Sequence, residues 1–189
     1  MENIYELWAK RNPSFEKKYQ ESILSVFTDY GKGVSQYLDV RGKIFGAGYE
    51  VYIIAFFIGL YNDKKKPLIE DASKKKVLGQ PIMYWGNIEE RARRRAYGKI
   101  RQHMFAALVA KTDIDWFALD KGDITVRGVV DKLIETMEQY ANFGFDFIKE
   151  KLEEDTNYFF KESAFLNVFT SFLIKNEEKD DDDNEPEDL

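Results

Sequence analysis

The chain contains no cysteine and only one histidine, His103. The lack of cysteine excludes disulfides, thiolate nucleophiles, zinc–thiolate sites and iron–sulfur clusters. A single histidine excludes ordinary zinc sites and leaves a Ser-His-Asp triad dependent on that one residue. The chain also lacks the Gly-x-Ser-x-Gly turn that would support such a triad. We therefore expect no metal, no cofactor and, as the leading interpretation, no catalytic residue.

Long hydrophobic runs are also missing. The most apolar segment, residues 51–60, is too short to span a bilayer. The first fifteen residues are charged and have no apolar core of the kind that a signal peptide needs. We expect a soluble cytoplasmic protein with no membrane contact.

Charge is distributed unevenly along the 189 residues, although the formal net charge is −6. Residues 176–189 hold nine acidic side chains and one lysine, and the rest of the chain holds 27 Lys and Arg against 25 Asp and Glu. Within residues 64–103 there are 12 Lys and Arg against 4 Asp and Glu. Screening limits fields to roughly 8–10 Å, so this local excess matters more to a partner than the total charge.

Apolar residues recur at helical spacing along most of the chain, which predicts an all-α fold. We expect a compact bundle of about five helices around a buried central apolar helix. The helices are predicted over residues 12–38, 51–61, 87–111, 125–152 and 156–174, and residues 63–81 are predicted to form a loop. Residues 1–175 would form one domain, and residues 176–189 a disordered acidic tail, because so polar a segment cannot bury anything.

The main candidate site is a basic face on the helix predicted over residues 87–111. At 100° per residue, five cations fall within an arc of roughly 160°: Arg91, Arg94, Arg95, Lys99 and Arg101. Arginine and lysine donors on such a face suit phosphate oxygens. Two lysine triplets in the preceding loop would extend the face: Lys64, Lys65, Lys66, Lys74, Lys75 and Lys76. The alternatives are a solvated face paired with acidic neighbours, and a protein interface.

Other polar residues have simpler interpretations. Gly46 and Gly48 resemble the start of a phosphate-binding loop, but the rest of that motif is missing, so we expect them to allow close packing at a helix entry. Glu50 would complement the helix dipole or pair with Arg41 or Lys43. His103 would lie in the core or at its boundary. We expect turn and capping roles for the aspartates around Trp116, with a hard-cation site as the alternative: Asp113, Asp115, Asp120 and Asp123.

The order of several sequence landmarks is similar to that of the DNA sulfur-modification protein DndE family. The landmarks are Phe57-Ile58-Gly59-Leu60, then Tyr84-Trp85-Gly86, then Met104-Phe105-Ala106-Ala107-Leu108 and finally Tyr140-Ala141-Asn142-Phe143-Gly144-Phe145. The resemblance covers residues 12–152. It implies an all-α, oligomeric protein that binds duplex or nicked DNA together with other proteins of a modification complex. It assigns no functional residue.

Three functions are compatible with these patterns. The first is a non-catalytic, nucleic-acid-associated subunit of a DNA-modification or phage-defence assembly, whose basic residues contact phosphates. The second is a scaffold that forms a homo- or hetero-oligomer through its aromatic and apolar surface. The third is an enzyme with a carboxylate site around residues 113–123.

Overall fold

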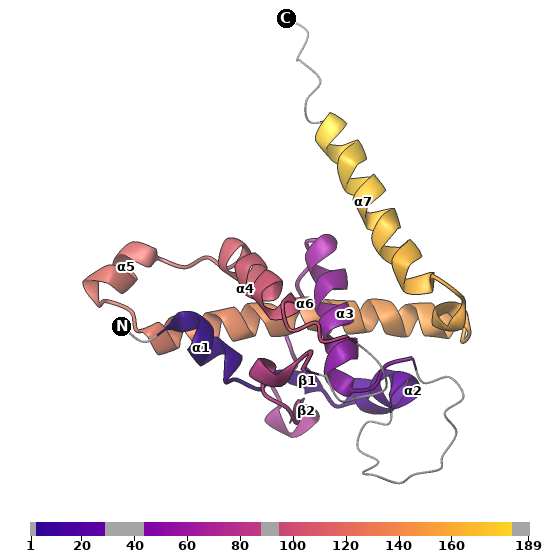
Figure 1. The fold of residues 1–189 in the computed structure, drawn as a ribbon, viewed down its shortest axis with the longest axis horizontal. Helices are drawn as coiled ribbons and strands as arrows, with labels where there is room; N and C mark the ends of the chain where they lie inside the picture. The colour runs from indigo at the N-terminus through magenta and orange to yellow at the C-terminus, as the bar shows by residue number, and fades with distance from the viewer. Residues whose placement is uncertain (1–2, 29–43, 88–94, 183–189) are drawn as a thin grey trace, which may run out of the picture.

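The longest helix, α6 (Val126–Glu154), forms the central axis of the fold. The computed structural model describes residues 3–28, 44–87 and 95–182, and in Figure 1 α6 runs across the whole body of the molecule. Thr125 caps the helix by accepting a hydrogen bond from the Gly128 amide at 3.1 Å. Its apolar residues recur at spacings of three and four and are buried along one side. The predicted helix over residues 125–152 is confirmed.

The second core helix, α3 (Gly48–Tyr61), crosses α6 and is buried on nearly all sides. Ala47 precedes it and has no side-chain acceptor, so Glu50 caps the helix start. Its carboxylate accepts from the Gly46 amide at 2.6 Å and from the Ala47 amide at 3.3 Å. The predicted central apolar helix is therefore confirmed, and so is the expected role of Glu50 at the helix start.

The N-terminal part differs from the expected long helix over residues 12–38. After the short helix α1 (Ile4–Ala9), a strand β1 (Ser14–Glu16) pairs with β2 (Lys75–Val77), and only then do a π-helical turn (Gln20–Leu24) and α2 (Ser25–Phe27) follow. The strands are antiparallel, with Phe15 opposite Lys76. The Asn12 amide donates to the Leu78 carbonyl, and the Ser14 backbone N–H donates to Glu138. These long-range partners replace a helical start at Asn12, and residues 29–43 lie outside the described residues.

The helix predicted over residues 87–111 is also shorter in the structure. Among the described residues of this range, only α4 (Ile100–Lys111) is helical, and residues 95–99 form a loop and turn. Residues 88–94 lie outside the described residues. Two contacts of Tyr97 hold this turn in place. Its N–H donates to the Gly86 carbonyl at 3.0 Å, and its hydroxyl donates to Glu50 Oε1 at 2.5 Å. Gly86 has a φ of 81°, a left-handed conformation that favours glycine.

The loop predicted over residues 63–81 is mostly irregular, but it contains a 3-10 turn (Ala72–Lys74) and the strand β2, and a second 3-10 turn, η3 (Ile82–Tyr84), follows it. Two further helices precede and follow α6. They are α5 (Trp116–Lys121) and, after a 3-10 turn (Tyr158–Phe160), α7 (Ala164–Asp182). In Figure 1 α7 leaves the end of α6 and projects away from the body. The last helix thus begins later than the predicted Thr156 and continues past Ile174 into the acidic segment.

Candidate nucleic-acid interface

The predicted basic residues do not form one ridge along a helix. Arg95 and Lys99 precede α4, and Arg101 lies in its first turn, so these three do not share a helical face. The expectation of a shared face fails because the chain turns at residues 95–99. Arg91 and Arg94 lie outside the described residues.

The first lysine triplet follows α3 and lies along α6. Lys66 pairs with Asp146, and Lys65 Nζ donates to the Lys111 carbonyl at 3.2 Å. Lys64 lies over the Phe143 ring, with its Nζ 5.6 Å from the ring centroid. Asp146 therefore neutralises part of the positive charge of this triplet. Such pairing is what we expect of a solvated face with acidic neighbours.

The second triplet lies at the β1–β2 ribbon. Lys74 Nζ lies 3.7 Å from Asp71, and Lys76 Nζ donates to Gln20 Oε1 at 2.9 Å. Lys75 is opposite Glu16 in the strand register and is half-buried. The backbone N–H of Lys17, next to Glu16, donates to the Lys74 carbonyl at 2.8 Å and ties the second triplet to the end of β1.

A buried polar cluster anchors this ribbon and the first triplet to α6. The Asn142 amide donates to Glu16 Oε1 at 3.0 Å and to the carbonyls of Lys66 and Pro67 at 3.3 and 2.9 Å. Burial acts to raise the pKa of Glu16, but hydrogen bonds from Lys18, Asn142 and the Ile69 amide outweigh it and hold the pKa below its ordinary value. The cluster acts as a structural tie between the linker, β1 and α6.

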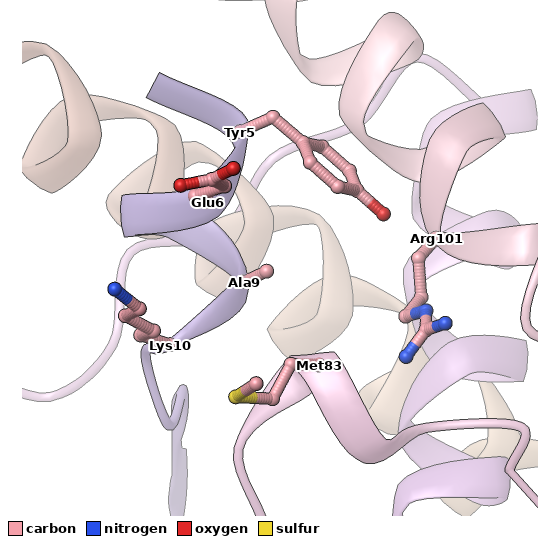
Figure 2. Close-up of a pocket in the computed structure, with 6 residues that line it drawn as sticks. All are labelled: Tyr5, Glu6, Ala9, Lys10, Met83 and Arg101. Atoms are coloured by element: carbon pink, nitrogen blue, oxygen red, sulfur yellow. The ribbon is translucent and has the colours of Figure 1, made fainter. Parts of the chain in front are cut away.

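A separate pocket opens between α1, η3 and α4, with a volume of about 290 Å³. Figure 2 shows Lys10 on one side of this pocket and Arg101 on the other. The ring of Tyr5 projects from α1 toward the side of Arg101, and the Met83 side chain from η3 lies between the two cations. The pocket therefore combines two positive side chains with an apolar wall.

Neighbouring contacts fix the positions of two of these groups. The Arg101 Nε donates to the Gly98 carbonyl at 3.0 Å, which orients the guanidinium. The Tyr5 ring packs edge-on against Phe105, at a centroid distance of 5.2 Å, and lies 5.8 Å from the Trp8 ring. The wall of the pocket is consequently held by the aromatic core beneath it.

The cations around this pocket are available to an external anion. In the part of the chain that the structure describes, no ion pair involves Lys10 or Arg101, the two cations that line the pocket. Arg95 and Lys99, which do not line it, also form no ion pair among these residues. One carboxylate, that of Glu6, also lines the pocket. Positive charge without an ion-pair partner among the described residues therefore lines this pocket from two sides.

Sequence reasoning identified Arg101 but missed Lys10, Tyr5 and Met83, which lie far from it along the chain. The backbone link that brings α1 and η3 together is the hydrogen bond from the Ile82 amide to the Arg11 carbonyl, at 3.1 Å. No local sequence pattern signals such a contact. The short helix α1, however, follows from Asn3, whose side chain accepts from the Tyr5 amide at 3.0 Å.

The remaining candidates have structural roles or positions. Asp115 caps α5 by accepting from the Ala118 amide at 2.8 Å, which confirms the expected capping role. His103 is exposed, so its expected place in the core or at its boundary is wrong.

Within the described ranges, no group of three His, Cys, Asp or Glu side chains could hold a metal ion. None of the helices described is both long and apolar enough to cross a membrane.

Comparison with protein families, with curated proteins and with solved structures finds no significant match to this chain. The fold and the site are consequently interpreted from their own geometry.

Proposed function

We propose that this protein is a non-catalytic nucleic-acid-binding protein whose contact surface is centred on the pocket between α1, η3 and α4. The observation that carries the proposal is the placement of Lys10 and Arg101 on opposite sides of an apolar wall, with no carboxylate paired to either among the described residues. Two such cations suit successive phosphates of a nucleic-acid backbone. The contact positions a backbone and reads no sequence.

The apolar wall supports a contact beyond the phosphates. Tyr5 and Met83 offer an aromatic ring and a polarisable thioether between the two cations. Bases that are free of the helical stack pack on surfaces of this kind whatever their identity. We therefore propose that duplex DNA binds through its phosphates, and that DNA with a nick or a single-stranded segment binds more tightly.

The lysine triplets belong to a second, weaker part of the surface in this proposal. Lys64 and Lys75 have no carboxylate partner among the described residues and would contact phosphates beyond the pocket. The similarity to the DndE family supports a place in a DNA-modification or phage-defence assembly, with protein partners. A cytoplasmic location is part of the same proposal.

Fluorescence anisotropy with labelled duplex, nicked and single-stranded DNA of one length tests the proposal. The double variant Lys10→Ala/Arg101→Ala should weaken binding of all three probes. It should also reduce the slope of log affinity against log salt by about 2, since each lost phosphate contact contributes about 0.9 for a duplex. Lys10 is exposed and Arg101 is half-exposed, so the fold should be retained, which circular dichroism of the variant checks.

The matched control is Lys121→Ala/Lys132→Ala, which removes the same charge from exposed positions that do not line the pocket. An equal loss of affinity in the control would show that net charge, and not this surface, drives binding. If the wild-type chain shows no salt-sensitive binding to any of the three probes, the proposed function is wrong.

A further inference from the structure

The sulfur chemistry of this chain is confined to methionine, because the sequence contains four methionines and no cysteine. Three of the four lie in the described residues. Met104 in α4 and Met137 in α6 are fully buried, at 0% exposure, whereas Met83 in η3 is 38% exposed. An oxidant in solution must reach the sulfur atom to react with it. Among the described residues, Met83 is therefore the methionine that an oxidant reaches first.

The fold fixes Met83 at the surface. Its neighbours Ile82 and Trp85 are both fully buried and occupy the core. The Ile82 N–H donates to the Arg11 carbonyl at 3.1 Å, and the Trp85 indole N–H donates to the Gln80 carbonyl at 2.9 Å. Because these two side chains are anchored in the core, the 3-10 turn leaves the Met83 side chain in the wall of the pocket.

The surroundings of Met83 are cationic. Figure 2 shows its side chain between Lys10 and Arg101, with the ring of Tyr5 projecting toward the side of Arg101. Glu6, the carboxylate that also lines the pocket, forms an ion pair with neither cation. An accessible thioether thus lies beside hydrogen-bond donors that have no ion-pair partner among the described residues.

We propose that Met83 is an oxidation site, and that its conversion to the sulfoxide weakens the contact of this pocket with nucleic acid. A hydroperoxide supplies the oxygen atom. The sulfur lone pair forms the S–O bond as the O–O bond breaks, the transferred oxygen passes its proton to the departing oxygen, and water or an alcohol leaves. The sulfur is oxidised by two electrons and the peroxide is reduced by two. The effect on binding rests on the proposed function, whereas the selective oxidation of Met83 does not.

The sulfoxide changes the pocket in two ways. It is polar, so it no longer provides an apolar surface beside Tyr5 on which an unstacked base can pack. Its oxygen also accepts hydrogen bonds, so it competes with a phosphate for the donors of Lys10 and Arg101. Both changes oppose the proposed contact, and enzymatic reduction of the sulfoxide reverses them.

Peptide mass spectrometry of the full chain after treatment with hydrogen peroxide tests the oxidation site. In the folded chain, Met83 should gain one oxygen atom at least about tenfold faster than Met104 and Met137. In urea the three methionines should react at similar rates, because the difference between them comes from burial. Equal rates in the folded chain would overturn the assignment of Met83, whatever the protein binds.

Fluorescence anisotropy before and after peroxide treatment tests the effect on binding, with single-stranded and duplex DNA as probes. The oxidised wild type should bind the single-stranded probe at least about fivefold more weakly, which is the loss expected for one base-stacking contact. The duplex should lose less, because its bases do not reach the wall of the pocket.

Two variants of Met83 separate its oxidation from damage elsewhere in the chain. Met83→Leu keeps an apolar side chain without sulfur, so its affinity should be the same before and after peroxide. Met83→Gln places a polar side chain of similar length in the wall, and should bind the single-stranded probe more weakly than Met83→Leu without any oxidant. Treatment of the oxidised wild type with methionine sulfoxide reductases should restore its affinity.

The outcomes distinguish this inference from the proposed function. An untreated wild type that binds DNA and keeps its affinity once Met83 is oxidised overturns the inference alone. So does Met83→Leu if peroxide lowers its affinity as much as that of the wild type, or a loss that persists after Met83 has been reduced. An untreated wild type that binds none of the probes overturns the proposed function and, with it, the effect of oxidation on binding.

Discussion

At the scale of single residues, Asn142 connects three segments that are far apart in the sequence. Its amide donates to Glu16 of β1 and to two carbonyls of the linker that follows α3. Asn142 is 2% exposed and Glu16 is 6% exposed, so water has little access to the contact between them. A buried polar group of this kind stabilises the fold only while each of its donors remains paired.

Replacing Asn142 by Asp should destabilise the protein strongly. The change keeps the shape of the side chain but removes both N–H donors and puts a second carboxylate against Glu16. An uncompensated buried charge costs about 3–5 kcal/mol of unfolding free energy. Urea unfolding monitored by circular dichroism measures the loss. Asn167→Asp, at an exposed position near the start of α7, is the control and should change stability by less than about 0.5 kcal/mol.

The carboxylates of this cluster also predict a dependence of stability on acid. Burial acts to raise the pKa of Asp146, but its contacts with Lys66, Tyr19 and Lys18 outweigh burial and lower the pKa from 3.8. The pKa of Glu16 is likewise lowered, from 4.5. A carboxyl with a lowered folded-state pKa stabilises the fold above its unfolded value and loses this contribution as pH falls through the folded value.

We therefore expect the unfolding free energy to fall as pH drops below about 4.5. Glu138 contributes with the opposite sign, because burial raises its pKa above 4.5 and its stabilisation is lost as pH rises. Asp146→Asn should be less stable than the wild type at neutral pH and should show a smaller loss in acid. Urea unfolding of both chains at neutral and acidic pH measures the difference. An equal loss in both would show that Asp146 does not contribute to the acid sensitivity.

At the scale of elements, the crossing of α3 and α6 depends on two glycines. A Cβ added to Gly144 would lie 1.8 Å from the Ala55 carbonyl oxygen, and one added to Gly59 would lie 2.1 Å from the Tyr140 carbonyl oxygen. The two helix backbones therefore approach more closely than any side chain would allow. Gly59 and Gly144 therefore stand where the packing of α3 against α6 leaves no room for a side chain.

Gly144→Ala should lower the unfolding free energy by about 1–3 kcal/mol or more, because the added methyl group forces the backbones apart. Gly128→Ala, near the start of the same helix, is the matched control. An added Cβ there would lie 3.4 Å from the Thr125 Oγ1, which is an ordinary contact. It should raise stability by about 0.5–1 kcal/mol, because alanine favours helix over glycine. Thermal unfolding of both variants should show shifts of opposite sign, and shifts of the same sign would contradict the packing argument.

The success of sequence-based prediction varied with the length of each element. The helices α3 and α6 were found because many residues contribute to each apolar pattern. The strands β1 and β2 were missed because three residues make no pattern, and their pairing joins segments about sixty residues apart. The prediction of one continuous helix over residues 87–111 is wrong at residues 95–99, because contacts of Tyr97 with Gly86 and Glu50 hold a turn that no local signal reveals. Of the residues that line the pocket, the sequence predicts only Arg101 as part of a site, because the others come from segments far from it along the chain.

At the scale of the whole molecule, positive and negative charge are separated along the sequence. Lys10 and Arg101 line a pocket on the body, and the backbone of α7, whose sequence contains the start of the acidic segment, leads away from the body. An acidic segment on the same chain competes with a polyanion for a cationic surface, and this competition weakens as salt screens both. The effect on binding should therefore depend on where the negative charge lies as well as on its amount.

Neutralising part of the acidic segment should strengthen nucleic-acid binding if the proposed function holds. Asp180→Asn/Asp181→Asn/Asp182→Asn/Asp183→Asn changes the net charge from −6 to −2 without shortening the chain. Anisotropy with labelled DNA should show several-fold tighter binding at low salt, and the gain should vanish at several tenths molar salt, where the screening length is only a few ångströms. The control variant, Asp113→Asn/Asp120→Asn/Asp123→Asn/Glu162→Gln, removes the same charge from four exposed positions outside the acidic segment. A smaller gain in this control would assign the competition to the acidic segment, whereas an equal gain would assign it to net charge alone.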